Sequence, residues 1–288
     1  MIRFRNSLQS RTAFALIAFV CVTAVFAASV QHGKKAAAPD LSPTPAAPAG
    51  EKPALVAPSI AQPRAEYQFP VGQTYVYGGE WRIFNAGTAT LRVEQAGREN
   101  RVVATANAAG TVALLYHVQD RLESFFDPSN FCSHSTSRHL EEGFRRVETS
   151  ITFDYQHGKA LLDHKNIKKK ESKHEEHEIP GCVTDMLSSV FYVASLPLLQ
   201  GKTYSFPIND GGPTLTVMVH VEAREAVKTP AGTFNAIRVQ PETSSSVLRD
   251  KGKIWIWYSD DAARVPVQMR ARMSWGTLTF SLLRIEKK

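Results

Sequence analysis

The sequence predicts a mainly β protein: a curved antiparallel sheet or partly open β-barrel of about eleven strands with one packed α-helix. The first indication is the period-two alternation of apolar and polar residues over 147–155, 215–224 and 265–273. Such strands are typical of antiparallel sheets that have one face in water. The second indication is the short spacing of turn signals, for example at 210–213 and 229–232, which suits a meander.

The first 30 residues have the composition of a secretory signal peptide. Three arginines precede an uncharged stretch over 13–30, and small residues allow cleavage after Ala27. The alternative is an uncleaved membrane anchor, because a stretch of this length is near the lower limit for crossing a bilayer. Lipid attachment at Cys21 is not expected, since bulky residues precede it. Either alternative predicts an exported protein of the periplasm or cell envelope.

Residues 31–66 are rich in proline and alanine, and we expect a disordered linker because such a segment buries too little apolar surface to fold. Residues 67–288 then form a single β-rich domain. The net charge of +7 falls to +4 without the three leader arginines, as 31 basic residues remain against 27 acidic. That excess does not indicate nucleic-acid binding, and the lysine run 168–170 has four glutamates close by in sequence and no interleaved aromatics.

The best helical pattern covers 184–196. Apolar residues recur there at helical spacing, Thr184 is the expected N-cap, and Asp185 lies in the first turn. Pro197 ends the pattern. Segment 108–118 fits either a short helix or a twisted strand.

Cys132 and Cys182 are the two cysteines that remain after signal cleavage. An even pair in an oxidising compartment predicts a disulfide. The alternatives are a reactive thiol or a metal site.

Two polar clusters have the residue types of catalytic or metal sites. His174 and His177 are three residues apart, and on a strand they point to opposite faces, so we expect a solvated hairpin and no metal. Asp260 and Asp261 are adjacent and lie where a turn is predicted, so they are not expected to flank one scissile bond. No catalytic or nucleotide-binding motif is present, and no cofactor is expected.

Several short segments spread over the domain carry a family pattern. They are Gly79-Glu80 with Gly87, Asp185 to Tyr192, Leu196-Pro197-Leu198, Thr229 to Phe234, Trp257 with Ser259-Asp260-Asp261, and Pro266-Val267. In these segments the sequence resembles the exported bacterial domain-of-unknown-function family 3108. The resemblance implies an envelope location and a β-rich fold, similar in outline to half-barrel carriers that shuttle lipoproteins or lipids across the periplasm. It implies no known activity, and Ala194 stands where a basic residue is expected.

These observations favour a non-enzymatic binding or carrier module for an apolar ligand such as a lipid or acyl chain. The ligand would lie in a hollow sheet lined by aromatic side chains, with the helix as plug or lid. The alternatives are a structural or protein-interaction module with a solid core, partnered by another envelope protein, and a hydrolase with a dispersed site. The expected ligand-binding residues are Trp81, Phe84, Leu187, Phe191, Trp255, Trp257, Trp275 and Phe280.

Overall fold

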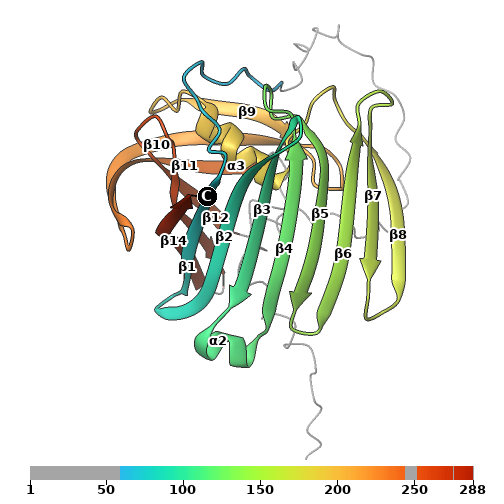
Figure 1. Ribbon diagram of the computed structural model, residues 1–288, viewed down its shortest axis with the longest axis horizontal. Coiled ribbons are helices and arrows are strands. Elements are labelled where there is room, and N and C mark those ends of the chain that lie inside the picture. Colours follow the sequence, from blue (N-terminus) through green and yellow to red (C-terminus); the bar gives the residue numbers. More distant parts are fainter. Residues whose placement is uncertain (1–58, 244–251, 275, 288) are drawn as a thin grey trace, which may run out of the picture.

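Figure 1 shows the computed structural model, which describes residues 59–243, 252–274 and 276–287. The expected signal peptide (1–30), most of the expected linker (31–66) and Trp275 lie outside these residues. The described chain forms fourteen antiparallel strands in one curved sheet with two helices, which confirms the predicted fold class. The estimate of eleven strands was too low, since polar strands such as β8 lack the apolar alternation used to recognise them.

The elements follow one another along the chain with short connections. They are β1 (Gln73–Trp81), β2 (Phe84–Ala96), β3 (Glu99–Ala108), α2 (Gly110–Leu115), β4 (Val118–Phe126), β5 (Ser133–Glu142), β6 (Arg145–Asp154), β7 (Lys159–Asn166), β8 (Glu171–Glu178), α3 (Met186–Ser195), β9 (Thr203–Ile208), β10 (Leu215–Thr229), β11 (Gly232–Thr243), β12 (Gly252–Ser259), β13 (Pro266–Met273) and β14 (Gly276–Lys287). Segment 108–118 thus contains a helix, α2.

Two meanders make up the sheet. Strands β1 to β8 pair in sequence order, as do β9 to β14, and the pairing of β1 with β14 joins the two sets. Strands β8 and β9 are the free edges, and α3 lies in the connection between them. One face of the sheet therefore curves around α3, with β9 to β11 crossing on one side of the helix and β2 to β5 on the other (Figure 1).

Helix α3 fills part of the concave face with aromatic and aliphatic side chains. Phe191 is only 1% exposed and packs edge-on against Phe69, with ring centroids 5.3 Å apart. Tyr192 packs against Phe206 at 4.9 Å, and the Tyr258 hydroxyl donates to the Val190 carbonyl at 2.9 Å. The helix is thus a central part of the core, held by both meanders.

The helix begins one residue later than its sequence suggests. Asp185, not Thr184, is the N-cap: its carboxylate accepts from the backbone N–H groups of Leu187 and Ser188 in a capping box. Thr184 instead bonds the Pro207 carbonyl at 3.1 Å, in an isolated bridge to Ile208. Threonine and aspartate are both good N-caps. Asp185 takes this position because Thr184 pairs with the backbone of β9.

The Asp185 carboxylate also joins the helix to the sheet. Its second oxygen accepts from Ser124 on β4 at 2.5 Å and from Ser133 on β5 at 2.6 Å. All three residues are buried. A buried carboxylate needs such donors, because an ionised group without them would lose its hydration uncompensated.

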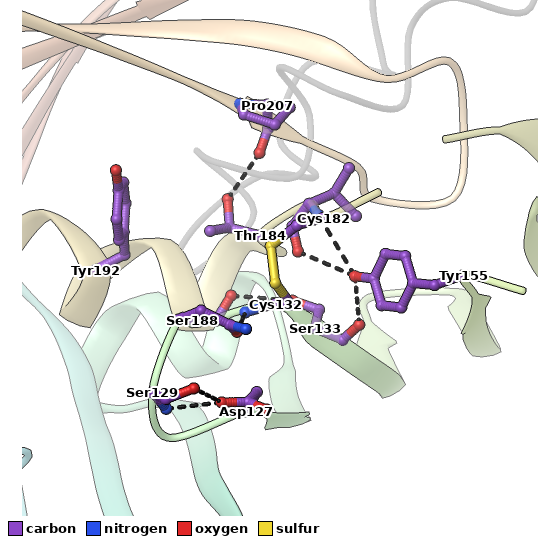
Figure 2. Close-up of a disulfide and its surroundings, with 12 residues drawn as sticks. Asp127, Ser129, Cys132, Ser133, Tyr155, Cys182, Thr184, Ser188, Tyr192 and Pro207 are labelled. Carbon is purple, nitrogen blue, oxygen red and sulfur yellow. Dashed lines mark hydrogen bonds between the residues drawn. A yellow bond between two sulfur atoms is a disulfide. The ribbon is translucent and has the colours of Figure 1, made fainter. Parts of the chain in front are cut away.

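Next to this network, Cys132 and Cys182 form the predicted disulfide (Figure 2). It ties the connection before β5 to the segment that leads into α3. The Tyr155 hydroxyl reinforces the same junction by donating to the Ser133 carbonyl at 2.7 Å.

The described chain reaches the core before Tyr67, where the linker was expected to end. Ile60 packs against the core, and the backbone N–H of Ala61 donates to the Tyr192 hydroxyl at 2.9 Å. The N–H of Arg64 bonds the Ser195 carbonyl at 3.1 Å. Residues 60–64 therefore contact the C-terminal half of α3.

Two buried carboxylates lie at the end of β4 and β5 that is farther from α3. Burial, reinforced by the nearby Glu142 carboxylate, raises the pKa of Asp120 to about 7. Burial also raises the pKa of Glu142, which Arg145 partly offsets. Asp120 accepts one backbone bond, from Glu141 at 3.1 Å. The pair is a local cost to stability when both groups are ionised.

We predict that Cys132→Ser lowers the free energy of unfolding by about 4 kcal/mol, because the disulfide closes a loop of about 50 residues in the unfolded chain. Urea titration of oxidised protein measures the loss. The far-ultraviolet circular dichroism should keep its β-rich form. If Cys132→Ser and wild type have equal midpoints under oxidising conditions, the bond does not form in solution.

Phe191→Ala should cost about 3–5 kcal/mol, since truncating a buried aromatic leaves a cavity. Phe144→Ala is the matched control: Phe144 is 91% exposed, and its loss should change stability by less than about 0.5 kcal/mol. Thermal and urea unfolding measure both variants. A small loss for Phe191→Ala would instead indicate a helix that covers an incompletely filled space.

Asp120 should make the protein less stable as pH rises from about 4 to about 7. In that range the folded Asp120 still holds its proton, whereas the unfolded residue has lost it, so rising pH favours unfolding. Asp120 makes its full contribution to the free energy of unfolding below pH 4, and this contribution is lost above pH 7. The difference is on the order of 2–4 kcal/mol. Urea midpoints measured across this range should vary less in Asp120→Asn. An unchanged pH dependence in the variant would assign the effect to other groups.

Candidate functional site: a cationic pocket on the outer face

A pocket of about 980 Å³ lies on the face of the sheet that points away from α3, over β1, β14, β13 and β12. The strand register explains which side chains line it. Glu80, Thr279, Arg270 and Trp255 are paired in one row across four strands. Gly78, Ser281 and Gln268 form the next row, in which the Gln268 amide donates to the Ser281 hydroxyl at 3.1 Å.

Glycine and a folded-back hairpin give the pocket its depth. At Gly78 a Cβ would lie 3.1 Å from a methyl carbon of Leu283, so any side chain there would occupy the pocket floor. The tip of the β10–β11 hairpin reaches across to β14, where the Ala231 N–H donates to the Leu282 carbonyl at 3.1 Å. Lys228 and Pro230 on this tip thereby form one wall.

The lining carries a net positive charge. Arg82, Arg270, Arg272 and Lys228 face a single carboxylate, Glu80. Within the part of the chain that the structure describes, Arg270, Arg272 and Lys228 take part in no ion pair, in contrast to most other arginines of the sheet. Arg270, Arg272 and Lys228 therefore form a local concentration of cations that have no ion-pair partner among the described residues.

Two tryptophans hold the arginines in place. The Arg270 guanidinium lies 5.2 Å from the Trp257 ring centroid, and Arg272 lies 5.6 Å from that of Trp255. Stacking uses the flat face of a guanidinium and leaves its in-plane N–H donors available. The Trp257 indole is itself fixed, because its N–H donates to Glu225 at 2.6 Å.

This arrangement suits recognition of an anion. Guanidinium groups bind phosphate and carboxylate through paired, charge-assisted hydrogen bonds. Around them, the hydroxyls of Thr88, Thr277, Thr279 and Ser281 supply neutral donors. Glu80 adds one acceptor, which suits a ligand that carries hydroxyl or ammonium groups beside its negative charge.

The structure separates the eight expected ligand-binding residues. Trp255 lines the pocket, and Trp257 lies beneath Arg270. Leu187, Phe191 and Phe280 are buried in the core around α3, and Trp81 packs at its margin. Phe84 is exposed at the β1–β2 turn, 6.5 Å from Trp81 between ring centroids, and Trp275 lies outside the described residues.

Sequence reasoning missed the polar residues that make the pocket. The alternation over 265–273 predicts Arg270 and Arg272 on the wet face of a strand, which is correct but gives them no role. A signal was present: Arg270 and Arg272 alternate along β13, as Trp255 and Trp257 do along β12, so both pairs share one face. The register that brings Glu80 beside Thr279 is not visible in a single sequence.

The other polar clusters have structural roles. The Asp261 carboxylate accepts from the Ala263 N–H at 3.0 Å and the Ser259 hydroxyl at 2.8 Å, which confirms the predicted turn. Asp260 pairs with Arg224 and Arg264. His174 on β8 pairs with Asp163 on β7. Among the described residues, no three histidine, cysteine or acidic side chains are close enough to hold a metal ion.

Comparison with known proteins gives a fold and a family. A crystal structure described as a β-barrel-like protein of domain-of-unknown-function family DUF1849 from Brucella abortus is similar, with a TM-score of 0.54 at 9% identity, over 76% of this chain and 98% of that chain. This likeness supports the fold alone. No helix within the described residues is long and apolar enough to cross a membrane.

Two further structures align at lower scores. One is a putative exported protein with a YmcC-like fold from Bacteroides fragilis, with a TM-score of 0.30 at 12% identity over 77% of this chain and 98% of that one. The other is a putative lipoprotein from Parabacteroides distasonis, with a TM-score of 0.29 at 13% identity, again over 77% of this chain and 98% of that one. No curated protein matches the sequence. Residues 74–283 match the family described as "Protein of unknown function (DUF3108)", and the chain belongs to that family.

Proposed function

We propose that this protein is a non-enzymatic binding module of the cell envelope, and that its ligand is an anionic lipid whose headgroup lies in the cationic pocket. The observation that carries the proposal is the pair Arg270 and Arg272, which stack on tryptophans and have no carboxylate partner among the residues that the structure describes. Export is inferred from the signal-like residues 1–30.

An amphiphile fits better than a small free anion because of where the pocket ends. Arg82 and Asn85 line it, and they flank Ile83 and Phe84, two exposed apolar side chains at the β1–β2 turn. The turn lies next to Arg272, because Thr277 pairs with Arg272 and its carbonyl accepts from the Arg82 N–H. A headgroup on Arg270 and Arg272 would therefore leave its acyl chains directed past Thr277 toward that turn. This placement keeps the expected ligand class, a lipid, but moves its headgroup from the space beside α3 to the outer face.

The lining supports binding more than catalysis. Histidines and carboxylates are the groups that most often carry out general acid–base chemistry, and among the described lining residues Glu80 is the single carboxylate, with no histidine or cysteine. Ser281 bonds Gln268, which cannot act as a base.

Addition of a partner strand to the sheet is also disfavoured. The β8 edge has the sequence ESKHEEHE and is polar throughout, with four glutamates and a lysine, and the β9 edge contains Pro207. Charge and proline are the usual means by which edge strands avoid pairing with other chains.

The test uses a short-chain lipid that stays monomeric in water. Isothermal titration calorimetry should show binding of dihexanoyl-phosphatidylglycerol to the full chain and much weaker binding of the zwitterionic phosphatidylcholine analogue. Arg270→Gln with Arg272→Gln should weaken binding at least about tenfold, since each charged hydrogen bond contributes 1.5–3 kcal/mol. Arg98→Gln with Lys202→Gln, two exposed cations outside the pocket, is the matched control and should bind as wild type does.

A second variant separates shape from charge. Gly78→Leu fills the floor while all four cations remain, and it should abolish binding with little loss of stability, since the Leu283 side chain can move. Equal affinity of wild type, the Gln pair and Gly78→Leu would show that the lipid binds elsewhere. Binding of inorganic phosphate without binding of the lipid would assign the pocket to a soluble anion.

A further inference from the structure

The sheet topology brings four chain connections to one edge. In an antiparallel meander every second connection lies on the same side, so the β1–β2, β3–β4, β5–β6 and β7–β8 connections form one row (Figure 1). We call this row the rim and define it as residues 82–83, 109–117, 143–144 and 167–170. Adjacent tips are two strands apart, about 10 Å, so the four tips extend over roughly 30 Å.

Each connection of the rim exposes a large apolar side chain. Ile83 is 88% exposed, Leu114 86%, Leu115 81% and Phe144 91%, and these are the four most exposed large hydrophobic residues of the described chain. Ile167, on the fourth tip, is 46% exposed. The connections at the opposite edge of the same meander, 97–98, 127–132 and 155–158, expose none. Connecting segments are normally polar, so this one-sided distribution requires an explanation.

The rim is also cationic. Its four connections contain Arg82 and three lysines, Lys168 to Lys170, and no acidic residue. The Lys168 ammonium lies 5.3 Å from the Phe144 ring centroid, so a cation of one tip contacts the apolar side chain of its neighbour. The lysines of this tip take part in no ion pair among the described residues.

The fold separates these lysines from most of the glutamates that follow them in sequence. In the β7–β8 hairpin, Glu178 pairs opposite Lys159 at the far end, seven residues along β8 from Glu171. At about 3.4 Å per residue this is more than 20 Å from the tip. Glu175 bonds Lys173 and His177 within its own strand. In the sequence these glutamates are close enough to neutralise the lysine run 168–170, but in the structure most of them lie too far from it to do so.

We propose that the rim docks this domain on the surface of a bilayer that contains anionic lipids. Exposed leucine, isoleucine and phenylalanine insert at the level of the headgroups, and the flanking lysines and Arg82 bind lipid phosphates. Charge complementarity selects an anionic membrane over an apolar protein groove, because the lysines would be left unpaired in the latter.

The test is hydrogen–deuterium exchange of the full chain with and without vesicles. With phosphatidylglycerol vesicles, residues 109–117, 143–144 and 167–170 should gain protection, whereas 97–98, 127–132 and 155–158 should not. Protection should disappear with phosphatidylcholine vesicles or in high salt. A local readout is needed because the apolar residues 13–30, if the segment is not cleaved, would also attach the chain to vesicles. Attachment through them alone would leave the rim unprotected.

Variants assign the effect to the rim. The triple change Lys168→Gln, Lys169→Gln and Lys170→Gln should lower the partition coefficient of the protected state about 100-fold. Leu114→Ser with Leu115→Ser and Phe144→Ser should abolish protection, while Val71→Ser with Leu199→Ser, exposed residues outside the rim, should not.

Three results would overturn the proposal. The rim could gain no protection with anionic vesicles, or both triple variants could be protected as much as the wild-type protein. The third is that the rim becomes protected without lipid, through self-association. Arg270→Gln with Arg272→Gln should leave docking unchanged, so failure of the pocket and failure of the rim are distinguishable.

Discussion

The buried carboxylate of Asp185 is the constraint on which the rest of the structure depends. It caps α3 and at the same time accepts hydroxyl donors from β4 and β5, so helix and sheet are positioned by one group. Removing any donor would leave part of a buried charge unpaired, which costs more than an ordinary hydrogen bond contributes. The disulfide from Cys132 lies beside the same network. Once α3 is held there, the second meander has an apolar surface around which to curve.

That curvature separates the molecule into two faces with different tasks. The concave face is occupied by core residues around α3, such as Phe191 and Phe206. Irregularities in strand pairing at Val221 and at Trp257 help β10 to β13 bend around them. The opposite face of β12 to β14 is released from packing on the helix and carries charged side chains, which the folded-back β10–β11 hairpin then walls in.

The parts that a single sequence predicts are those set by local chemistry. The alternation of apolar and polar residues predicts the sheet, and the helical spacing of apolar residues after Asp185 predicts the helix. The isolated pair of cysteines predicts the disulfide. The pocket was not predictable in the same way, because Glu80 and Arg270 are 190 residues apart and meet only through the pairing of β1 with β14. The rim was hidden for a related reason: Ile83, Leu114 and Phe144 look like isolated apolar residues until the meander aligns their turns.

The pocket and the rim meet at the β1–β2 turn, and this shared turn connects the two proposals physically. Arg82 belongs to both, and its backbone N–H bonds the Thr277 carbonyl at 2.9 Å, which fixes the turn against β14. Ile83 and Phe84 are the exposed apolar residues of the same turn. A domain that rests on a bilayer by its rim would therefore hold the pocket entrance at the depth of the lipid phosphates. A headgroup could pass from the membrane to Arg270 along a path of cations, with its acyl chains left in the bilayer, so the cost of exposing them to water would not arise.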